Sequence, residues 1–150
     1  MGLCFEDFTP GRRFETPGRT VSDEDVVAFA ELSGDRNPLH LDDTYARTTP
    51  FGGRIAHGAL GLAVATGLFS QLGITTGTLV ALAGVEWNFR APIRPGDTVR
   101  LRLRVAEQRP LQRTDRGLVR FAAELVNQSD EVVQEGVLTE LIRTRPVPNA

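Results

Sequence analysis

An alternating run of apolar and charged residues constrains the fold of this chain most strongly. In TVRLRLRV, residues 98–105, every second residue is apolar, and arginines occupy the positions between Val99 and Val105. Successive side chains of a β-strand point to opposite faces, so the run predicts a strand with one buried and one wet face. GLVRFAAELVN and VVQEGVLTELIRT continue the pattern, and the short QSDE connection between them predicts a hairpin. The second half of the chain is therefore expected to form an antiparallel sheet.

A nearly continuous apolar segment precedes these strands. Residues 55–74, IAHGALGLAVATGLFSQLGI, are almost long enough to span a bilayer. The segment also contains four glycines and four polar residues, which are His57, Thr66, Ser70 and Gln71. A helix that is apolar on most faces and rich in small residues is typical of a buried position. We expect a central helix that starts near Ile55 and ends near Gly73, and no membrane span.

A shorter helix is predicted upstream. Ser22 is a suitable N-cap with Asp25 three residues later, and Gly34 is a typical C-terminal stop. An apolar face is expected from five residues, Val26, Val27, Phe29, Ala30 and Leu32. Asp35 would then follow directly after the end of a rigid element.

The order of these segments predicts the fold class. Helices followed by long antiparallel strands indicate an α+β fold, in which one long apolar helix lies against one strongly curved sheet. A chain of 150 residues fits a single domain, residues 1–150, and can bury its own core. Long strands with exposed edges also predict pairing with another copy, as a homodimer or a higher homo-oligomer.

Composition excludes several functions. All 17 basic residues are Arg, so a lysine Schiff base and a P-loop are excluded. The net charge of −2 gives no field that would attract nucleic acid or an anionic membrane. The only cysteine, Cys4, can form no internal disulfide, and the N-terminus lacks the pattern of a signal peptide. A cytoplasmic protein is expected.

The loop SGDRNPLHLDD, residues 33–43, concentrates side chains that can move protons. Asp35 and His40 lie five residues apart, and a carboxylate with an imidazole is the commonest pair for proton transfer near neutral pH. Pro38 is expected to keep residues 37–40 out of a regular helix, and Asn37 to brace the turn. Asp35 alone would indicate a turn or helix-end aspartate, and His40 alone a partly buried histidine with its hydrogen bonds satisfied. Together they predict that both side chains reach one water.

A second fragment, GGRIAHGAL at residues 52–60, opens the apolar helix. The first backbone N–H groups of a helix are unpaired and bind anionic oxygen, and Gly58 has no side chain to block that approach. Gly58 is thus a candidate oxyanion donor for a carbonyl that gains negative charge. His57 could be a ligand or a base, but a structural role in holding the loop is preferred. A metal bound by His40, His57 and the adjacent Asp42 and Asp43 is possible, although none is expected because the spacing matches no tight ligand set.

These motifs together resemble the MaoC-like (R)-specific enoyl-CoA hydratases, also called hydratase 2. The resemblance rests on SGDRNPLH, RIAHGAL and WNFRAPIRPGDTV in that order, and covers most of the chain. It implies a hot-dog fold, in which a curved antiparallel sheet wraps a long central helix, and a dimer. It also implies reversible addition of water to a trans-2-enoyl thioester of coenzyme A or an acyl-carrier protein, with no separate cofactor.

The resemblance implies roles for individual residues as well. Asp35 and His40 fall on the family's catalytic pair, and Asn37 on the position that orients the loop. Gly58 falls on the residue whose N–H receives the thioester oxygen, and Thr66 on a serine of the acyl pocket. Either residue of the pair could be the base; His40 is preferred as the acceptor of the proton of water, with Asp35 sharing its return.

Other interpretations of the same residues stay open. The same fold could carry a hot-dog thioesterase, which would aim water at C1 in place of C3, or a non-catalytic subunit that binds acyl thioesters. Three further residues, Phe51, Leu60 and Phe69, are candidates for the acyl tunnel with Thr66. Arg90 and Arg94 could meet coenzyme A phosphates or be surface charge, and the acyl group itself is not predicted.

Overall fold

The computed structural model describes residues 1–148 and contains one antiparallel sheet. Its strand order is β1-β4-β5-β6-β3, and the short β2 also pairs with β4. The strands are β1 (Arg13–Glu15), β2 (Arg19–Thr20), β3 (Leu79–Phe89), β4 (Thr98–Pro110), β5 (Arg116–Val126) and β6 (Val132–Arg143). The predicted sheet and the hairpin between β5 and β6 are confirmed.

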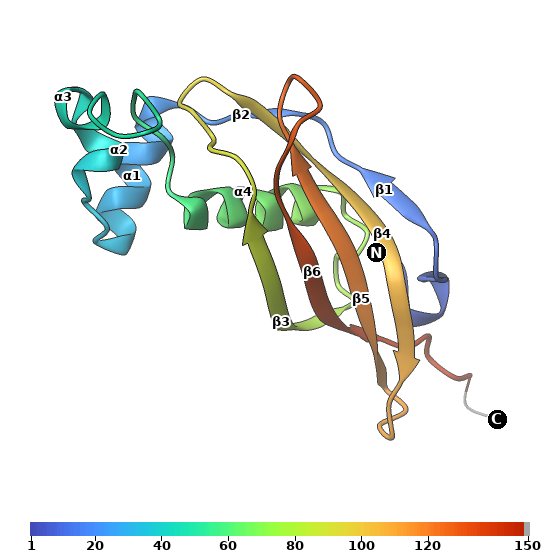
Figure 1. Cartoon of the computed structure of the whole chain (residues 1–150). Coiled ribbons are helices and arrows are strands. Elements are labelled where there is room, and N and C mark those ends of the chain that lie inside the picture. Colours follow the sequence, from blue (N-terminus) through green and yellow to red (C-terminus); the bar gives the residue numbers. More distant parts are fainter. Residues whose placement is uncertain (149–150) are drawn as a thin grey trace.

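The central helix α4 (Gly58–Gln71) lies across the concave side of this curved sheet (Figure 1). The helix buries small and large apolar residues together, among them Leu60, Gly61, Val64, Ala65, Leu68 and Phe69. Phe69 packs edge-on against Phe121 of β5, with ring centroids 5.0 Å apart. The expected buried helix is confirmed, although it begins three residues later and ends two residues earlier than expected. No helix within residues 1–148 is both long and apolar enough to cross a bilayer.

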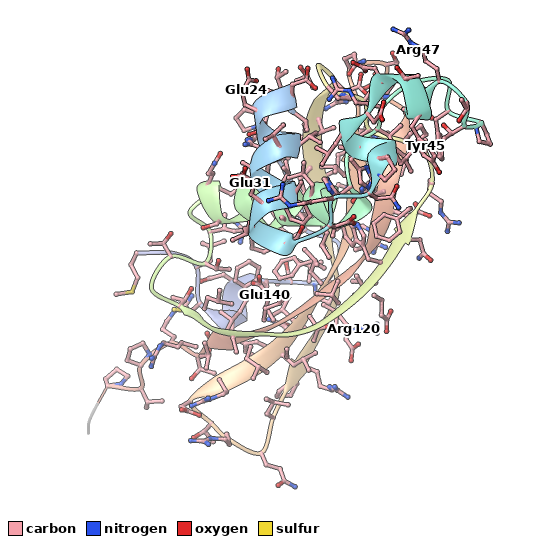
Figure 2. All side chains as sticks on the ribbon, turned by 90° about the vertical axis from the view of Figure 1, so that its left-hand side faces the viewer. Glu24, Glu31, Tyr45, Arg47, Arg120 and Glu140 are labelled. Carbon is pink, nitrogen blue, oxygen red and sulfur yellow. The ribbon has the colours of Figure 1, made fainter. Side chains whose placement is uncertain are left out.

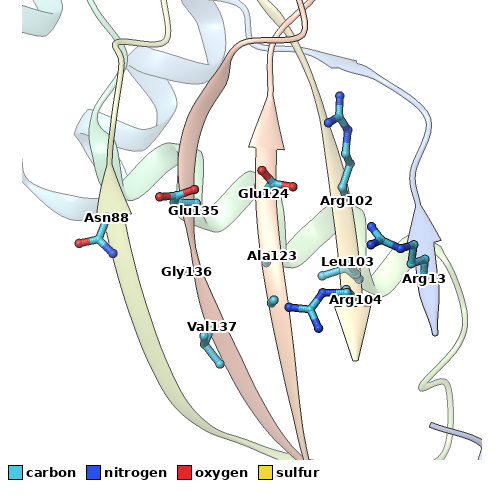
Figure 3. Close-up of a pocket in the computed structure, with 11 residues that line it drawn as sticks. Arg13, Asn88, Arg102, Leu103, Arg104, Ala123, Glu124, Glu135, Gly136 and Val137 are labelled. Atoms are coloured by element: carbon cyan, nitrogen blue, oxygen red, sulfur yellow. The ribbon is translucent and has the colours of Figure 1, made fainter. Parts of the chain in front are cut away.

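The alternation in β4 has the predicted effect. Val99, Leu101, Leu103 and Val105 are buried against the core, whereas the intervening arginines lie on the outer face of the sheet (Figure 3). Arg100 pairs with Glu15 at 2.7 Å and also with Asp130. These pairs agree with a solvated face of mixed charge, the preferred interpretation of the arginine row over a phosphate-binding strip.

The edge strand β3 carries apolar side chains that the chain itself leaves uncovered. Four of them, named here the β3 row, are Leu79, Leu82, Val85 and Phe89, all exposed. Directly paired residues of an antiparallel sheet point to the same face. Each member of the row is paired with a buried residue of β6, so the row faces the concave side of the sheet.

Three helices form a group beyond the N-terminal end of α4 (Figure 1). They are α1 (Asp23–Ser33), α2 (Pro38–Leu41) and α3 (Asp43–Ala46), and a short 3-10 turn, η1 (Phe5–Asp7), precedes the first strand. Ser22 and Asp25 form the predicted capping box, and the N–H of Ser22 lowers the pKa of the Asp25 carboxyl. Gly34 ends α1 in the left-handed region at φ 79°.

The apolar face predicted for α1 is only partly correct. Val26 and Ala30, one helical turn apart, are buried, but Val27 and Leu32 are exposed, Leu32 by 85%. A helix that lies at the end of the domain is covered on one narrow side only. Glu24 and Glu31 extend from its outer side (Figure 2).

The expectation that Pro38 keeps residues 37–40 out of a helix is wrong. Pro38 is the first residue of α2, and Asn37 is its N-cap. Proline is tolerated at the first helical position because the N–H that it lacks has no intrahelical partner there. The Asn-Pro pair therefore begins a helical turn and carries His40 on it.

Candidate active site

Asp35 is held by the end of α1. The Ser33 hydroxyl donates to the Phe29 carbonyl oxygen at 2.7 Å and accepts the N–H of Asp35 at 3.1 Å. The Asn37 N–H donates to Asp35 Oδ1 at 3.2 Å, and the side chain of Asp35 is 52% exposed. One carboxylate oxygen is thus engaged by the loop, and Oδ2 faces His40.

Asn37 orients the turn that delivers His40. Its Oδ1 accepts the N–H of Leu39 at 3.0 Å, so α2 begins with its first donors satisfied. His40 lies on this turn with its imidazole buried. This geometry agrees with the bracing role predicted for Asn37.

The carbonyl partners of the two histidines fix their protonated nitrogens. His40 Nδ1 lies 2.7 Å from the Ile55 carbonyl oxygen, and His57 Nε2 lies 2.9 Å from the Asp35 carbonyl oxygen. A carbonyl oxygen only accepts, so each of these nitrogens must carry hydrogen. In a neutral His40, Nε2 is then the bare nitrogen that can accept a proton.

His40 Nε2 and Asp35 Oδ2 lie 4.0 Å apart. This is too far for a direct hydrogen bond, but both atoms can reach one bridging water. The rings of His40 and His57 are stacked with centroids 3.8 Å apart. Phe29 packs on the His57 ring, with centroids 4.9 Å apart. The imidazole of His40 is thereby clamped in one orientation.

Gly58 begins α4 beside this pair. His57 is the N-cap residue, but its side chain makes no capping bond, so the first N–H groups of α4 stay available. Gly58 also lines a cavity of about 580 Å³ with Phe51, Ile55, Ala56 and Phe89. A Cβ on Gly58 would lie 2.8 Å from the Phe89 ring. Gly58 therefore has room for no side chain, because the Phe89 ring packs against it.

Comparison with known proteins identifies the family of this chain. The family model of the MaoC-like domain matches residues 6–127. The chain belongs to the MaoC-like dehydratase family. A 3-hydroxybutyryl-CoA dehydratase of Methylorubrum extorquens is 41% identical over 139 residues, which are 89% of this chain and 80% of that protein. An (R)-specific enoyl-CoA hydratase of Rhodospirillum rubrum is 37% identical over an alignment that covers 63% of this chain and 64% of that protein.

Solved structures give the same assignment. A MaoC-like dehydratase from Rhodospirillum rubrum superimposes with a TM-score of 0.85 at 32% identity and covers 97% of this chain and 100% of that one. A Mycobacterium tuberculosis protein with a double hot-dog fold gives a TM-score of 0.80 at 25% identity, over 99% of this chain and 46% of that one. The predicted hot-dog fold is confirmed.

Not all predicted site residues of this MaoC-like domain come together. Single atoms of Asp35, His40 and His57 lie within 4.8 Å of one another just before Gly58, and Asn37 is bonded to Asp35. Asp35 and His40 do not line the cavity beside Gly58. Thr66 lies eight residues further along the helix, about 12 Å at the usual rise, and lines a separate cavity with Phe69. Leu60 is buried and lines neither of these two cavities.

The two arginines proposed for phosphate contact have protein partners. Arg90 lines the cavity beside Gly58 but pairs with Glu135 at 2.9 Å. Arg94 donates to the Phe51 carbonyl oxygen at 2.7 Å. Arg90 thus lines the cavity, and Arg94 contacts Phe51, which also lines it.

Sequence reasoning missed two residues that support the MaoC-like site. Gln134 of β6 donates to the Gly58 carbonyl oxygen at 3.1 Å and accepts from Trp87 Nε1 at 2.8 Å. Arg54 pairs with Asp23 at 2.9 Å and Asp43 at 2.8 Å, and the bond to Asp43 raises the pKa of the guanidinium. These contacts join distant segments, so no local motif could have indicated them.

Three possible metal ligands also meet here. Single atoms of Asp35, His40 and His57 lie within 4.8 Å of one another. Both histidines were predicted as possible metal ligands, together with Asp42 and Asp43, whereas Asp35 was not. The two imidazole rings are stacked, so an ion between them would lie outside both ring planes. The lone pairs of imidazole nitrogens lie in the ring plane and would not point at such an ion. The donor set is available, but its geometry is poor for an ion bound by both histidines.

Proposed function

We propose that the protein reversibly hydrates trans-2-enoyl thioesters to (R)-3-hydroxyacyl thioesters, on coenzyme A or an acyl-carrier protein. The observation that supports this most is the position of His40 Nε2, 4.0 Å from Asp35 Oδ2, on a ring that stacks on His57, the N-cap residue of α4. The names of the relatives, a 3-hydroxybutyryl-CoA dehydratase and an (R)-specific enoyl-CoA hydratase, describe the two directions of such a reaction.

In the proposed mechanism, one water lies between the carboxylate of Asp35 and the imidazole of His40. His40 Nε2 accepts a proton as the water oxygen forms a bond to C3, and the Asp35 carboxylate orients the water through its second hydrogen. The π pair of the C2–C3 double bond becomes the C1–C2 double bond of an enolate, and the carbonyl π pair moves to the thioester oxygen; both shifts reverse when C2 takes up a proton. The proton then passes to C2 with the help of Asp35, so that H and OH are added from one side.

The developing enolate needs a hydrogen-bond donor at the thioester oxygen. The N–H of Gly58 is suited to this, because it is unpaired at a helix start and belongs to a fixed element. Gln134 holds the carbonyl of the same residue and keeps its peptide plane in place. The cavity of about 580 Å³ beside Gly58 is the proposed site of the thioester group.

We propose that this chemistry needs no metal and no cofactor beyond the thioester carrier itself. Dialysis against a chelator is then expected to leave the rate of hydration unchanged. Loss of activity, with recovery on adding one divalent metal, would instead make Asp35, His40 and His57 a metal centre.

We also propose that the protein is a homodimer joined through β3. This strand ends the sheet and has a free edge among the described residues, and the β3 row beside it is apolar and exposed. Exposed edge strands and apolar patches are typical of surfaces that pair with a partner. A second copy would extend the sheet and cover the row.

Crotonyl-CoA provides the test of the proposed function. The enoyl absorbance and the release of free thiol are followed together. We expect loss of absorbance without thiol, and formation of the (R)-alcohol on a chiral column. Thiol release at the same rate would point to hydrolysis and contradict the proposal.

A further inference from the structure

A second cavity lies towards the far end of α4 from the proposed catalytic pair. Its volume is about 140 Å³, and residues of α4, β3 and β6 line it. Most of the lining is apolar or carries a hydroxyl: Thr66, Phe69, Ser70, Thr75, Leu79, Leu82 and Leu138. The eighth lining residue is Glu140, the one ionisable group in that lining (Figure 2).

Glu140 is in an unusual place for a carboxyl. It is only 6% exposed, and its Oε2 has no hydrogen-bond partner among residues 1–148. Burial raises the pKa of Glu140 to about 7. A buried polar atom without a partner costs free energy, and such atoms are rare in native structures unless they have a use. Neither the core nor the proposed catalytic pair uses this one.

The β3 row connects this cavity with the one beside Gly58. Leu79 and Leu82 line the cavity of Glu140, Phe89 lines the cavity of Gly58, and Val85 lies between them on the same strand. On the neighbouring strand β6, Gln134 lines the cavity of Gly58 and Glu140 lines the second cavity. These two residues are six positions apart, which is about 20 Å along a strand. The two cavities share no lining residue, but the exposed apolar β3 row runs from one to the other.

We propose that Glu140 receives a hydroxyl group at the far end of the acyl chain. The inference rests on the proposed function and names its substrate class, ω-hydroxylated medium-chain enoyl thioesters. Thr66 lies about 12 Å and Ser70 about 18 Å from Gly58 along α4, so the acyl group would have about ten to fifteen chain atoms. Its methylene groups would lie along the β3 row, between this row and the second copy of the chain in the proposed dimer.

The chemistry of the cavity favours a hydroxyl over other ends. A hydroxyl can donate to Oε2 when Glu140 is ionised and accept from it when Glu140 is protonated. A methyl end would leave Oε2 without a partner, and a carboxylate end would bring two like charges together. An ammonium end would need a buried ion pair, whose desolvation offsets much of the attraction.

The test compares three enoyl-CoA substrates of equal chain length, ending in hydroxyl, methyl or carboxylate. For the unmodified protein we expect kcat/KM for the hydroxyl end to exceed that for the methyl end by at least about tenfold. The carboxylate end should be the poorest substrate. In Glu140→Leu the preference should reverse, with the methyl end first. Glu124→Leu, on the outer face of the sheet, is the matched control and should keep the original order.

The ratio of kcat/KM between two substrates, measured on one variant, does not depend on how much of the protein is active. Each outcome therefore supports or overturns the proposed role of Glu140. The same order of substrates in the unmodified protein and in Glu140→Leu would overturn the role of Glu140, while hydration of crotonyl-CoA would leave the proposed function intact. Failure to hydrate any enoyl-CoA, crotonyl-CoA included, would reject the proposed function and this inference with it. Size-exclusion chromatography of Glu140→Leu separates an effect on the substrate from one on assembly, and a changed oligomer would count against the inference.

Discussion

At the scale of single residues, backbone carbonyls decide what the two histidines can do. His40 donates to Ile55 and His57 to Asp35, so neither ring needs a carboxylate to fix its tautomer. His57 then acts as a support: it closes the loop on Asp35 and stacks on His40. Its Nδ1 is buried without a hydrogen-bond partner in the described chain, which agrees with a supporting role for this ring.

Glu140 makes a prediction about stability at this scale. Its pKa is raised from 4.5 to about 7 in the folded protein because burial disfavours the charge. The folded state keeps a proton that the unfolded chain releases, so stability falls as pH rises from 4.5 through about 7. The loss should approach about 3 kcal/mol above that window. Urea unfolding from pH 4.5 to 8.5 should show it in the unmodified protein and not in Glu140→Gln. An equal decline in both would contradict this account.

At the scale of elements, the start of α4 is where structure and proposed chemistry meet. His57 has φ −56° and ψ 137°, an extended conformation that suits a residue before proline, and Gly58 is the first helical residue. Proline at position 58 is thus compatible with the backbone but removes the N–H. The helix can lose its proposed oxyanion donor without losing its geometry.

Gly58→Pro is predicted to lower kcat by about 10²–10³-fold, the usual effect of losing one oxyanion donor. Gly58→Ala is the matched control, because its Cβ would also press on the Phe89 ring, 2.8 Å away, yet it keeps the N–H. Steady-state hydration of crotonyl-CoA measures both. Similar rates for the two variants would show that the Phe89 contact matters and the N–H does not.

At the scale of the whole molecule, the sheet is incomplete at β3. Its apolar row is exposed although each member is paired with a buried residue of β6, so the concave face is left open at this edge of the described chain. Both cavities of the proposed substrate path adjoin this row. Assembly and catalysis would therefore depend on the same strand.

Val85→Glu should disrupt the proposed dimer, because Val85 is 41% exposed in the middle of the row and a charge there would be desolvated. Light scattering should then report monomers and a lower rate of hydration. Leu32→Glu, at an exposed position of α1, should leave the dimer intact. A dimer that survives Val85→Glu would place the interface elsewhere.

The sequence predicted those features of the fold that depend on local periodicity. The alternation from Val99 to Val105 predicts a strand with one buried face, and the apolar run of α4 predicts a buried helix. Both predictions are confirmed. Pro38 was misread because the rule against proline in helices does not apply to the first turn. Val27 and Leu32 were misjudged because burial depends on which neighbour covers a helix.

In the candidate site too, the residues of a local motif could be predicted from the sequence, and those placed by long-range contacts could not. Asp35, Asn37 and His40 lie within six residues, so their meeting was predictable from the loop alone. Gln134 and Glu140 were not, because strand pairing brings them under α4 from the other end of the chain. Residues placed by long-range contacts leave no motif in a single sequence.

The central claim is that Asp35 and His40 together activate one water, and substitution of each tests it most directly. Asp35→Asn and His40→Gln are each predicted to lower kcat for crotonyl-CoA hydration by about 10²–10⁴-fold, with folding unchanged by circular dichroism. Asp42→Asn is the control, since the amide oxygen can still accept the N–H of Tyr45 that caps α3. Near-normal kcat in either Asp35→Asn or His40→Gln would contradict the account and remove that residue from the mechanism.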